Sequence, residues 1–153
     1  EGGGAAIDSF YADTKVINCT FLKNYGYEGG AIYNRFSDIE LINSKFINNT
    51  AERGGGIYNN RGYLLIRNST FNGNSAEHLG GGVKSWGMCD IYDSDIRNNV
   101  GLYGGGVYIS DFICCIVFLF ISTTIIINIW SSIIIHKIKH CLHLLVLHYI
   151  NYL

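Results

Sequence analysis

The sequence predicts an all-β fold, in which residues 1–111 form a right-handed parallel β-helix wound as a solenoid. Three observations lead to this prediction. A four-residue motif that begins with Asn or Asp recurs every 25 residues, and a glycine cluster follows each copy at a nearly constant distance. Short runs of β-branched and aromatic residues lie between these markers, and they lack helical periodicity.

The recurring motif occupies residues 18–21, 43–46, 68–71 and 93–96. Its fourth positions are Phe21, Phe46, Phe71 and Ile96. Three residues after each of these comes an asparagine, giving the set Asn24, Asn49, Asn74 and Asn99. Stacked coils place like residues over like at about 4.8 Å. We therefore expect an aromatic column inside the solenoid and a column of mutually bonded amides at a turn.

The glycine clusters mark a second bend in each unit. Their leading pairs are Gly29 and Gly30, Gly54 and Gly55, Gly80 and Gly81, and Gly104 and Gly105. Glycine suits positive φ or close backbone approach, so these pairs predict sharp turns. The third unit has one extra residue before its glycines and one fewer after them. Residues 2–4 match the glycines of an earlier, truncated unit, which makes about four and a half coils.

Two apolar columns supply the predicted strands. They comprise Val16, Leu41, Ile66 and Ile91, and Ile32, Ile57, Val83 and Val107. One coil cannot bury its own apolar residues, whereas coils stacked in register can. A unit of this length also provides the crossover that parallel pairing needs, and such crossovers are nearly always right-handed. A leucine-rich repeat has an overlapping period, but it needs several leucines per unit, and these units contain from zero to two.

The repeats resemble the polymorphic outer membrane protein repeat, whose signature pairs F-x-x-N with G-G-A-I. Residues 21–24 and 29–32 match both halves, and residues 46–59 read FINNTAERGGGIYN. The third unit also keeps F-x-x-N, whereas the fourth has Ile96 in place of the phenylalanine. The resemblance covers residues 2–109. It implies a surface-exposed or secreted right-handed β-helix, often an adhesin passenger exported by an autotransporter.

The charges of the repeat region exclude one class of partner. Residues 1–111 carry nine basic and 12 acidic side chains, a net charge of −3, whereas the whole chain has a formal net charge of −1. Nucleic-acid binding needs clustered lysine and arginine, so we expect no such partner. The chain begins inside a glycine-rich repeat strand without a signal peptide. We therefore interpret it as a fragment of a longer protein whose targeting signal lies upstream.

The cysteines predict neither a disulfide framework nor a metal site. Cys19 and Cys89 lie nearly three coils apart, about 14 Å at the strand spacing, and this exceeds the Cα separation that a disulfide spans. The sequence has no Cys-x-x-Cys pair, so we expect no zinc and no cofactor. His78 stands alone in the inserted turn of the third unit and is interpreted as a surface residue.

An enzyme is the principal alternative, because pectate lyases and polygalacturonases also use the right-handed β-helix. Their chemistry needs clustered carboxylates with a basic residue nearby. The minority catalytic candidates here are Asp90, Asp93, Asp95 and Arg97, with Asp93 and Asp95 on one face of a predicted strand. The competing interpretation is that Asp93 replaces the asparagine of its column and Asp95 is solvated.

A tyrosine column follows the glycine strands and is a candidate binding stripe. It comprises Tyr33, Tyr58 and Tyr108, and Lys84 interrupts it. These residues alternate with the Ile and Val column, so one set faces inward and the other outward. Exposed tyrosine suits contacts with protein or carbohydrate. The alternative is that these aromatics only stiffen the sheet.

The sequence changes character after Asp111, and residues 112–153 form an apolar tail that is expected to be helical. Residues 112–135 contain no charge and are long enough for a transmembrane helix. Lys137 and Lys139 follow, which would place the C-terminus in the cytoplasm and the repeats outside. The tail also lacks Gly, Ala, Pro, Asp, Glu, Gln, Arg and Met. That bias indicates, as an alternative, an out-of-frame reading of an AT-rich gene.

We therefore expect a surface-exposed or secreted adhesin-like protein with a non-enzymatic binding or scaffold role. Its partner would be a protein or glycan of a host or neighbouring cell, and membrane contact would run through residues 112–135. Its expected location is the cell surface, the outer membrane or the extracellular space. The alternatives are a polysaccharide-active β-helix enzyme and a structural spacer of a cell-envelope protein.

Overall fold

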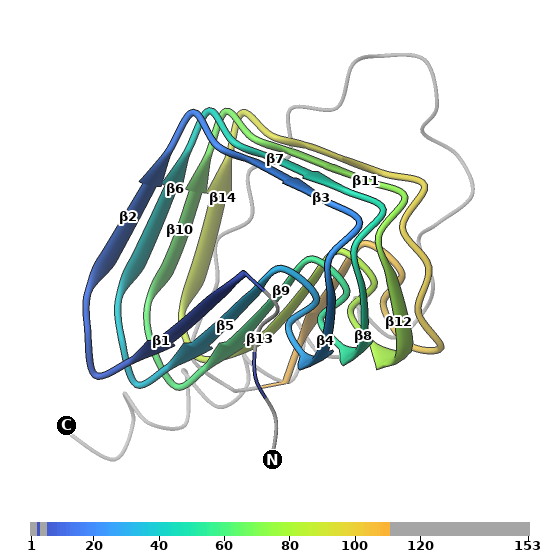
Figure 1. The fold of residues 1–153 in the computed structure, drawn as a ribbon, viewed down its shortest axis with the longest axis horizontal. Helices are drawn as coiled ribbons and strands as arrows, with labels where there is room; N and C mark the ends of the chain where they lie inside the picture. The colour runs from blue at the N-terminus through green and yellow to red at the C-terminus, as the bar shows by residue number, and fades with distance from the viewer. Residues whose placement is uncertain (1–2, 4–5, 111–153) are drawn as a thin grey trace, which may run out of the picture. The chain divides into compact units, whose positions relative to one another are not determined.

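The chain forms a parallel β-solenoid of about four coils, which confirms the predicted fold class for the repeats (Figure 1). The computed structural model describes Gly3 and residues 6–110. In this part of the chain, 16 short strands pair with one another in parallel. The winding of the coils resembles that of a right-handed helix (Figure 1). The predicted apolar tail, residues 112–153, lies outside the described residues.

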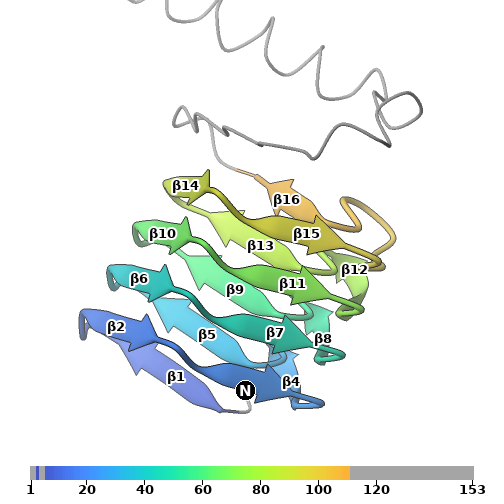
Figure 2. The ribbon, with the colours of Figure 1, turned by 90° about the horizontal axis from the view of Figure 1, so that it is seen from above.

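Four sheets of five, four, four and three strands run along the solenoid, and successive strands of each sheet come from successive coils (Figure 2). The first sheet contains β1 (Ile7–Phe10), β5 (Ile32–Arg35), β9 (Ile57–Asn60), β13 (Val83–Trp86) and β16 (Val107–Ile109). The second contains β2 (Thr14–Ile17), β6 (Ile39–Ile42), β10 (Leu64–Arg67) and β14 (Cys89–Tyr92). The third contains β3 (Thr20–Leu22), β7 (Lys45–Ile47), β11 (Thr70–Asn72) and β15 (Asp95–Arg97). The fourth contains β4 (Tyr25–Glu28), β8 (Thr50–Arg53) and β12 (Ser75–Leu79).

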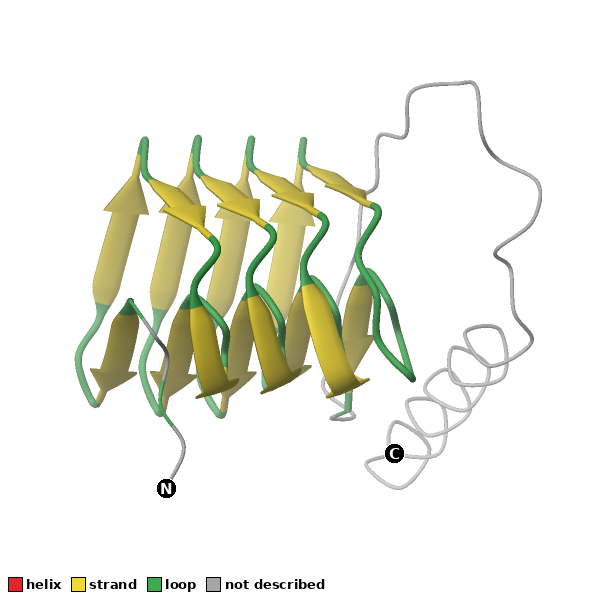
Figure 3. Ribbon diagram, turned by 45° about the vertical axis from the view of Figure 1, so that its right-hand side comes forward, coloured by secondary structure: helices red, strands yellow, loops and turns green. Residues whose placement is uncertain are grey.

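Short turns separate the sheets (Figure 3). The recurring Asn or Asp of the motif occupies one of these turns. This column lies between the second and third sheets and has positive φ: 55° at Asn18, 51° at Asn43, 47° at Asn68 and 47° at Asp93. Asn and Asp tolerate this left-handed conformation better than most residues with a Cβ. The motif is therefore a corner, and its fourth residue begins the next inward-facing column.

The leading glycines form a second corner, and each glycine of a pair has its own reason to lack a side chain. Gly29 and Gly54 have φ values of 71° and 66°. At Gly55 a Cβ would overlap the carbonyl oxygen of Gly81 in the neighbouring coil. The first glycine thus provides the left-handed bend, and the second allows the backbones of stacked coils to approach.

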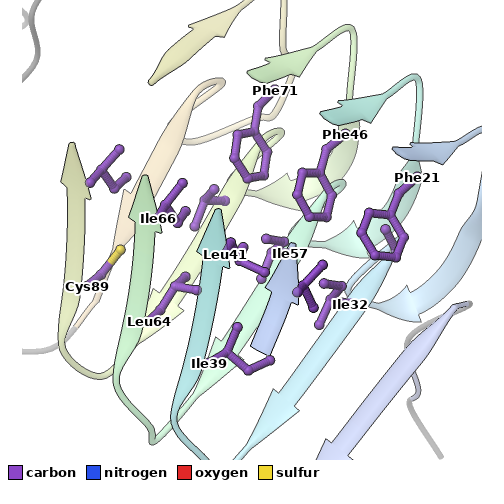
Figure 4. Close-up of a cluster of buried hydrophobic side chains, with 14 residues drawn as sticks. Phe21, Ile32, Ile39, Leu41, Phe46, Ile57, Leu64, Ile66, Phe71 and Cys89 are labelled. Carbon is purple, nitrogen blue, oxygen red and sulfur yellow. The ribbon is translucent and has the colours of Figure 1, made fainter. Parts of the chain in front are cut away.

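The core is one continuous cluster of aliphatic and aromatic side chains from the inner faces of the sheets (Figure 4). Register places Val16 beside Leu41, and Leu41 beside Ile66. The side chains of Leu41 and Ile66 are fully buried. Each coil therefore covers the apolar residues of the next, as the two predicted apolar columns require.

The irregular third unit is accommodated by a β-bulge in β12. Ala76 pairs with Ala51, but Leu79 pairs with Arg53, so Glu77 and His78 together oppose Glu52. The turn after β13 is one residue shorter than the turn after β9. The 25-residue offset therefore returns where Leu64 pairs with Cys89. None of the described residues belongs to a helix that is long and apolar enough to span a membrane. The candidate transmembrane segment 112–135 lies outside these residues.

Candidate functional site

The phenylalanine column is a stack of parallel rings inside the solenoid (Figure 4). The ring centroids of Phe21 and Phe46 lie 4.7 Å apart, and those of Phe46 and Phe71 lie 4.5 Å apart with an interplanar angle of 2°. Ile96 pairs with Phe71 and continues the column as a partly buried side chain. These rings fill the space that a ligand would need, so the column has a packing role.

The asparagine column is a chain of amide hydrogen bonds parallel to the stacking direction. The Nδ2 atoms of Asn24, Asn49 and Asn74 each donate to the Oδ1 atom of the next asparagine at 2.9 Å, and Asn99 ends the chain. The backbone N–H of Asn24 also donates to Asn49 Oδ1. Asn49 and Asn74 are fully buried. The side-chain polar atoms of both residues are hydrogen-bonded to the neighbouring coils, as buried polar groups generally are.

Two further polar columns lie inside or beside the core, and sequence reasoning missed their role. Asn34 Nδ2 donates to Asn59 Oδ1 at 2.7 Å, and Asn59 Nδ2 donates to Ser85 Oγ at 3.0 Å. Ser44 Oγ accepts from the backbone N–H of Cys19, and Ser69 Oγ accepts from that of Ser44. The sequence contained a signal for the column of Asn34 and Asn59, because Ile-Tyr-Asn recurs at residues 32–34 and 57–59.

The tyrosine column does not form the exposed stripe that the sequence predicted. Tyr33 and Tyr58 each expose only 5% of their surface, although they lie on the outer side of the first sheet. Their rings stack on one another at 5.3 Å, and the phenol oxygen of Tyr33 accepts a hydrogen bond from Asn60. Burial, assisted by a hydrogen bond with Glu28, raises the pKa of Tyr33 to about 12. The expectation of exposure is therefore wrong for Tyr33 and Tyr58.

Lys84 is part of this tyrosine column rather than a break in it. Its side chain is buried, and Nζ lies 5.3 Å from the ring centroid of Tyr58 and 5.0 Å from that of Tyr108. Nζ also donates to Ser110 Oγ at 2.6 Å. A cation between two aromatic faces gains from their quadrupoles, and the gain is larger where water is excluded. The whole column is thus engaged in contacts between coils.

The minority catalytic residues are not brought together into a site. Asp93 lies in a positive-φ turn, not on a strand with Asp95 as expected. Asp95 forms an exposed ion pair with Arg97 at 3.3 Å. Asp90 accepts a hydrogen bond from the hydroxyl of Tyr63 at 2.8 Å, which raises the pKa of that tyrosine to about 12. No group of three or more His, Cys, Asp or Glu residues suited to a metal occurs among the described residues.

A surface hollow of about 380 Å³ lies beside β2 and β6. Its polar groups already bond to one another: Lys15 Nζ lies 2.7 Å from Glu40 Oε2, and Asp13 Oδ1 accepts from the backbone N–H of Asp38. Asp38 Oδ1 accepts in turn from the backbone N–H of Tyr63. These are contacts between successive coils.

The fold and its columns define a β-solenoid repeat protein whose coils bond mainly to one another. The family model of the Chlamydia polymorphic membrane protein repeat matches residues 18–35 and 43–60, which confirms the resemblance seen in the sequence. The two matched segments occupy the same phase, from the Asn corner to the strand of the first sheet. Comparison with curated proteins and with solved structures gave no match.

Proposed function

We propose that this chain is part of an adhesin-like rod that is exposed at the cell surface or secreted, with a non-enzymatic binding role. One observation carries the proposal: the buried asparagines bond to equivalent residues of neighbouring coils. A solenoid built in this way is an extended scaffold, and its outer surface is what differs from coil to coil. The match of two coils to a polymorphic membrane protein repeat supports a surface role.

The location can be tested on intact cells that produce the protein. An antibody against the repeat region should label intact cells or the medium, and protease added outside should remove the signal. Labelling that appears only after the cells are permeabilised would contradict the proposal. A cytoplasmic protein released by lysis serves as the control for leakage.

The binding role can be tested with the purified full chain on immobilised fibronectin, laminin, collagen and sulfated glycans. We expect saturable binding to at least one surface, and loss of binding after thermal unfolding. A chain that is exposed on cells but binds none of these surfaces, nor host cells, would favour the structural spacer instead. Release of reducing or unsaturated ends from pectin would favour the enzyme, and Asp93→Ala is the variant to test then.

A further inference from the structure

A row of large aromatic and arginine side chains lies on the outer corner where the first sheet turns into the second. We call it the aromatic stripe. Phe10 and Trp86 are the last residues of β1 and β13, and Tyr11, Phe36 and Arg61 are the turn residues after β1, β5 and β9. The backbone N–H of Tyr11 bonds to the carbonyl of Arg35, and that of Phe36 to the carbonyl of Asn60. The members therefore come from four successive coils.

The side chains of the aromatic stripe contact one another along the rod. The rings of Tyr11 and Phe36 are stacked with centroids 5.2 Å apart, and the rings of Phe10 and Tyr11 form a T-shaped pair with centroids 4.6 Å apart. The guanidinium of Arg61 lies 5.7 Å from the ring centroid of Phe36 and 4.6 Å from that of Trp86. The stripe is therefore a preformed surface that needs little ordering when a partner binds.

The backbone conformation at this corner is unusual for the residues that occupy it. Tyr11, Phe36 and Arg61 have φ values of 50°, 54° and 60°. A bulky residue at positive φ is a rare and strained choice. The other positive-φ columns of the described coils carry mainly Asn or Gly, such as Asn43 and Gly54. This corner therefore carries large side chains despite a local cost, and a turn alone does not require them.

The stripe is open to solvent, unlike the tyrosine column of the same sheet. The exposed fractions are 53% for Phe10, 70% for Tyr11, and 38% for both Phe36 and Trp86. Within the described chain, Arg61 has aromatic contacts but no salt bridge, whereas Arg35 is paired with Asp8 at 2.7 Å. Exposed Trp, Tyr and Arg are the residues that dominate binding energy at protein interfaces. An acidic group of a partner would complement Arg61.

The geometry distinguishes a protein partner from a sugar chain. A sugar ring packs on the open face of an aromatic side chain. Here Tyr11 and Phe36 cover each other's faces, and Arg61 lies over the faces of Phe36 and Trp86. Phe10 in turn lies under the guanidinium of Arg35, 4.8 Å from its ring centroid. Ring faces engaged in this way are less open to a sugar ring, whereas apolar side chains with a carboxylate near Arg61 suit the exposed parts of the stripe. We propose that the aromatic stripe docks a protein partner that presents an apolar segment and an acidic side chain opposite Arg61.

This inference rests on the proposed binding role and names the surface that performs it. The test selects random peptides displayed on phage for binding to the purified full chain. We expect the enriched peptides to combine aromatic or aliphatic residues with Asp or Glu. A parallel selection on the Arg61→Glu variant should enrich Lys or Arg in place of the acidic residues, because the charge of the docking surface is reversed.

Two variants separate binding from folding. Phe36→Asn places a residue that tolerates positive φ at the same turn, so its melting temperature should be unchanged or higher. Its affinity for the selected peptides should nevertheless fall about 10-fold or more, as should that of Trp86→Ala. The matched control is Tyr25→Ala, which removes an exposed aromatic side chain from β4, away from the stripe. Tyr25 is 73% exposed, close to the 70% of Tyr11. This control should keep full affinity.

Four results would overturn the inference. They are the absence of peptides that depend on Phe36 and Trp86, the same enriched peptides on Arg61→Glu, competition by a heparin oligosaccharide, and concentration-dependent dimerisation that Trp86→Ala abolishes. The last two would assign the surface to a glycan or to a second copy. A chain that is absent from the cell surface but selects stripe-dependent peptides would refute the proposed location and leave this inference standing.

Discussion

At the scale of single residues, the buried amide chain shows how a polar side chain can stabilise an apolar interior. The Oδ1 atom of Asn49 accepts from both the backbone and the side chain of Asn24, and its Nδ2 atom donates to the carbonyl of Phe21 and to Asn74. An isolated buried amide is unfavourable, but an amide with every partner in place is not. The amide column therefore fixes the register in which successive coils stack.

Asn49→Ala should destabilise the protein by about 2–4 kcal/mol, because it leaves the two donors of half-buried Asn24 and the carbonyl of Phe21 without their partner. Denaturant unfolding of the full chain measures this. Asn72→Ala, which removes a half-exposed asparagine of β11, should change the free energy of unfolding by no more than about 0.5 kcal/mol. Equal losses for the two variants would contradict the special role of the buried column.

Alkaline pH should destabilise the folded chain through Tyr33. Its pKa is about 12 in the folded chain and 10.0 ordinarily, mainly because burial disfavours the phenolate. The stability that this group contributes is fully present below pH 10 and is lost as the pH rises toward 12. Tyr33→Phe should therefore reduce the fall in the unfolding midpoint between about pH 10 and about pH 12. A fall of unchanged steepness in the variant would show that Tyr33 is not responsible.

At this scale the repeat period predicts which side chains stack on one another, but it does not predict how deeply each side chain is buried. Identical residues at a constant spacing placed Phe46 over Phe21 and Asn49 beside Asn24. Alternation along β5 and β9 assigned Tyr33 and Tyr58 to the outer side, but not their burial. That burial depends on contacts with residues of other positions, such as Asn60 and Glu28, whose side chains vary between coils.

At the scale of elements, the β-bulge of β12 explains why an inserted residue leaves the solenoid intact. Glu77 and His78 are exposed, and pairing resumes at Leu79 on the far side of the bulge. A one-residue slip would instead turn the inner face of a strand outward. The sequence showed the extra residue, but only the register shows that it is absorbed within a strand before the glycines.

Deletion of His78 should leave the free energy of unfolding within about 1 kcal/mol of the parent value, because pairing on both sides of the bulge is already aligned. The matched control is deletion of Glu52, which lies at the equivalent place in the regular strand β8. That deletion shifts the register of β8 by one residue, so the variant should no longer be cooperatively folded at room temperature. Thermal melts followed by circular dichroism compare the two, and equal damage would contradict the proposed accommodation.

At the scale of the whole molecule, stability comes from contacts between neighbouring coils. Each coil of the described chain is held by the apolar columns, the amide chain and the parallel ladders, and these contacts repeat with nearly the same partners. Repeat number and phase were readable from the sequence, because stacking demands equivalent residues in successive units. The outer surface was not readable in the same way, since each coil can vary there without changing the core.

The central claim is that equivalent side chains of successive coils lie directly over one another. Nuclear Overhauser contacts between the rings of specifically labelled phenylalanines test it most directly. The ring centroids lie 4.7 Å apart for Phe21 and Phe46 and 4.5 Å apart for Phe46 and Phe71. We predict cross-peaks from Phe46 to both Phe21 and Phe71, and none between Phe21 and Phe71. A direct contact between Phe21 and Phe71, or no contact from Phe46 to either, would contradict the stacked solenoid.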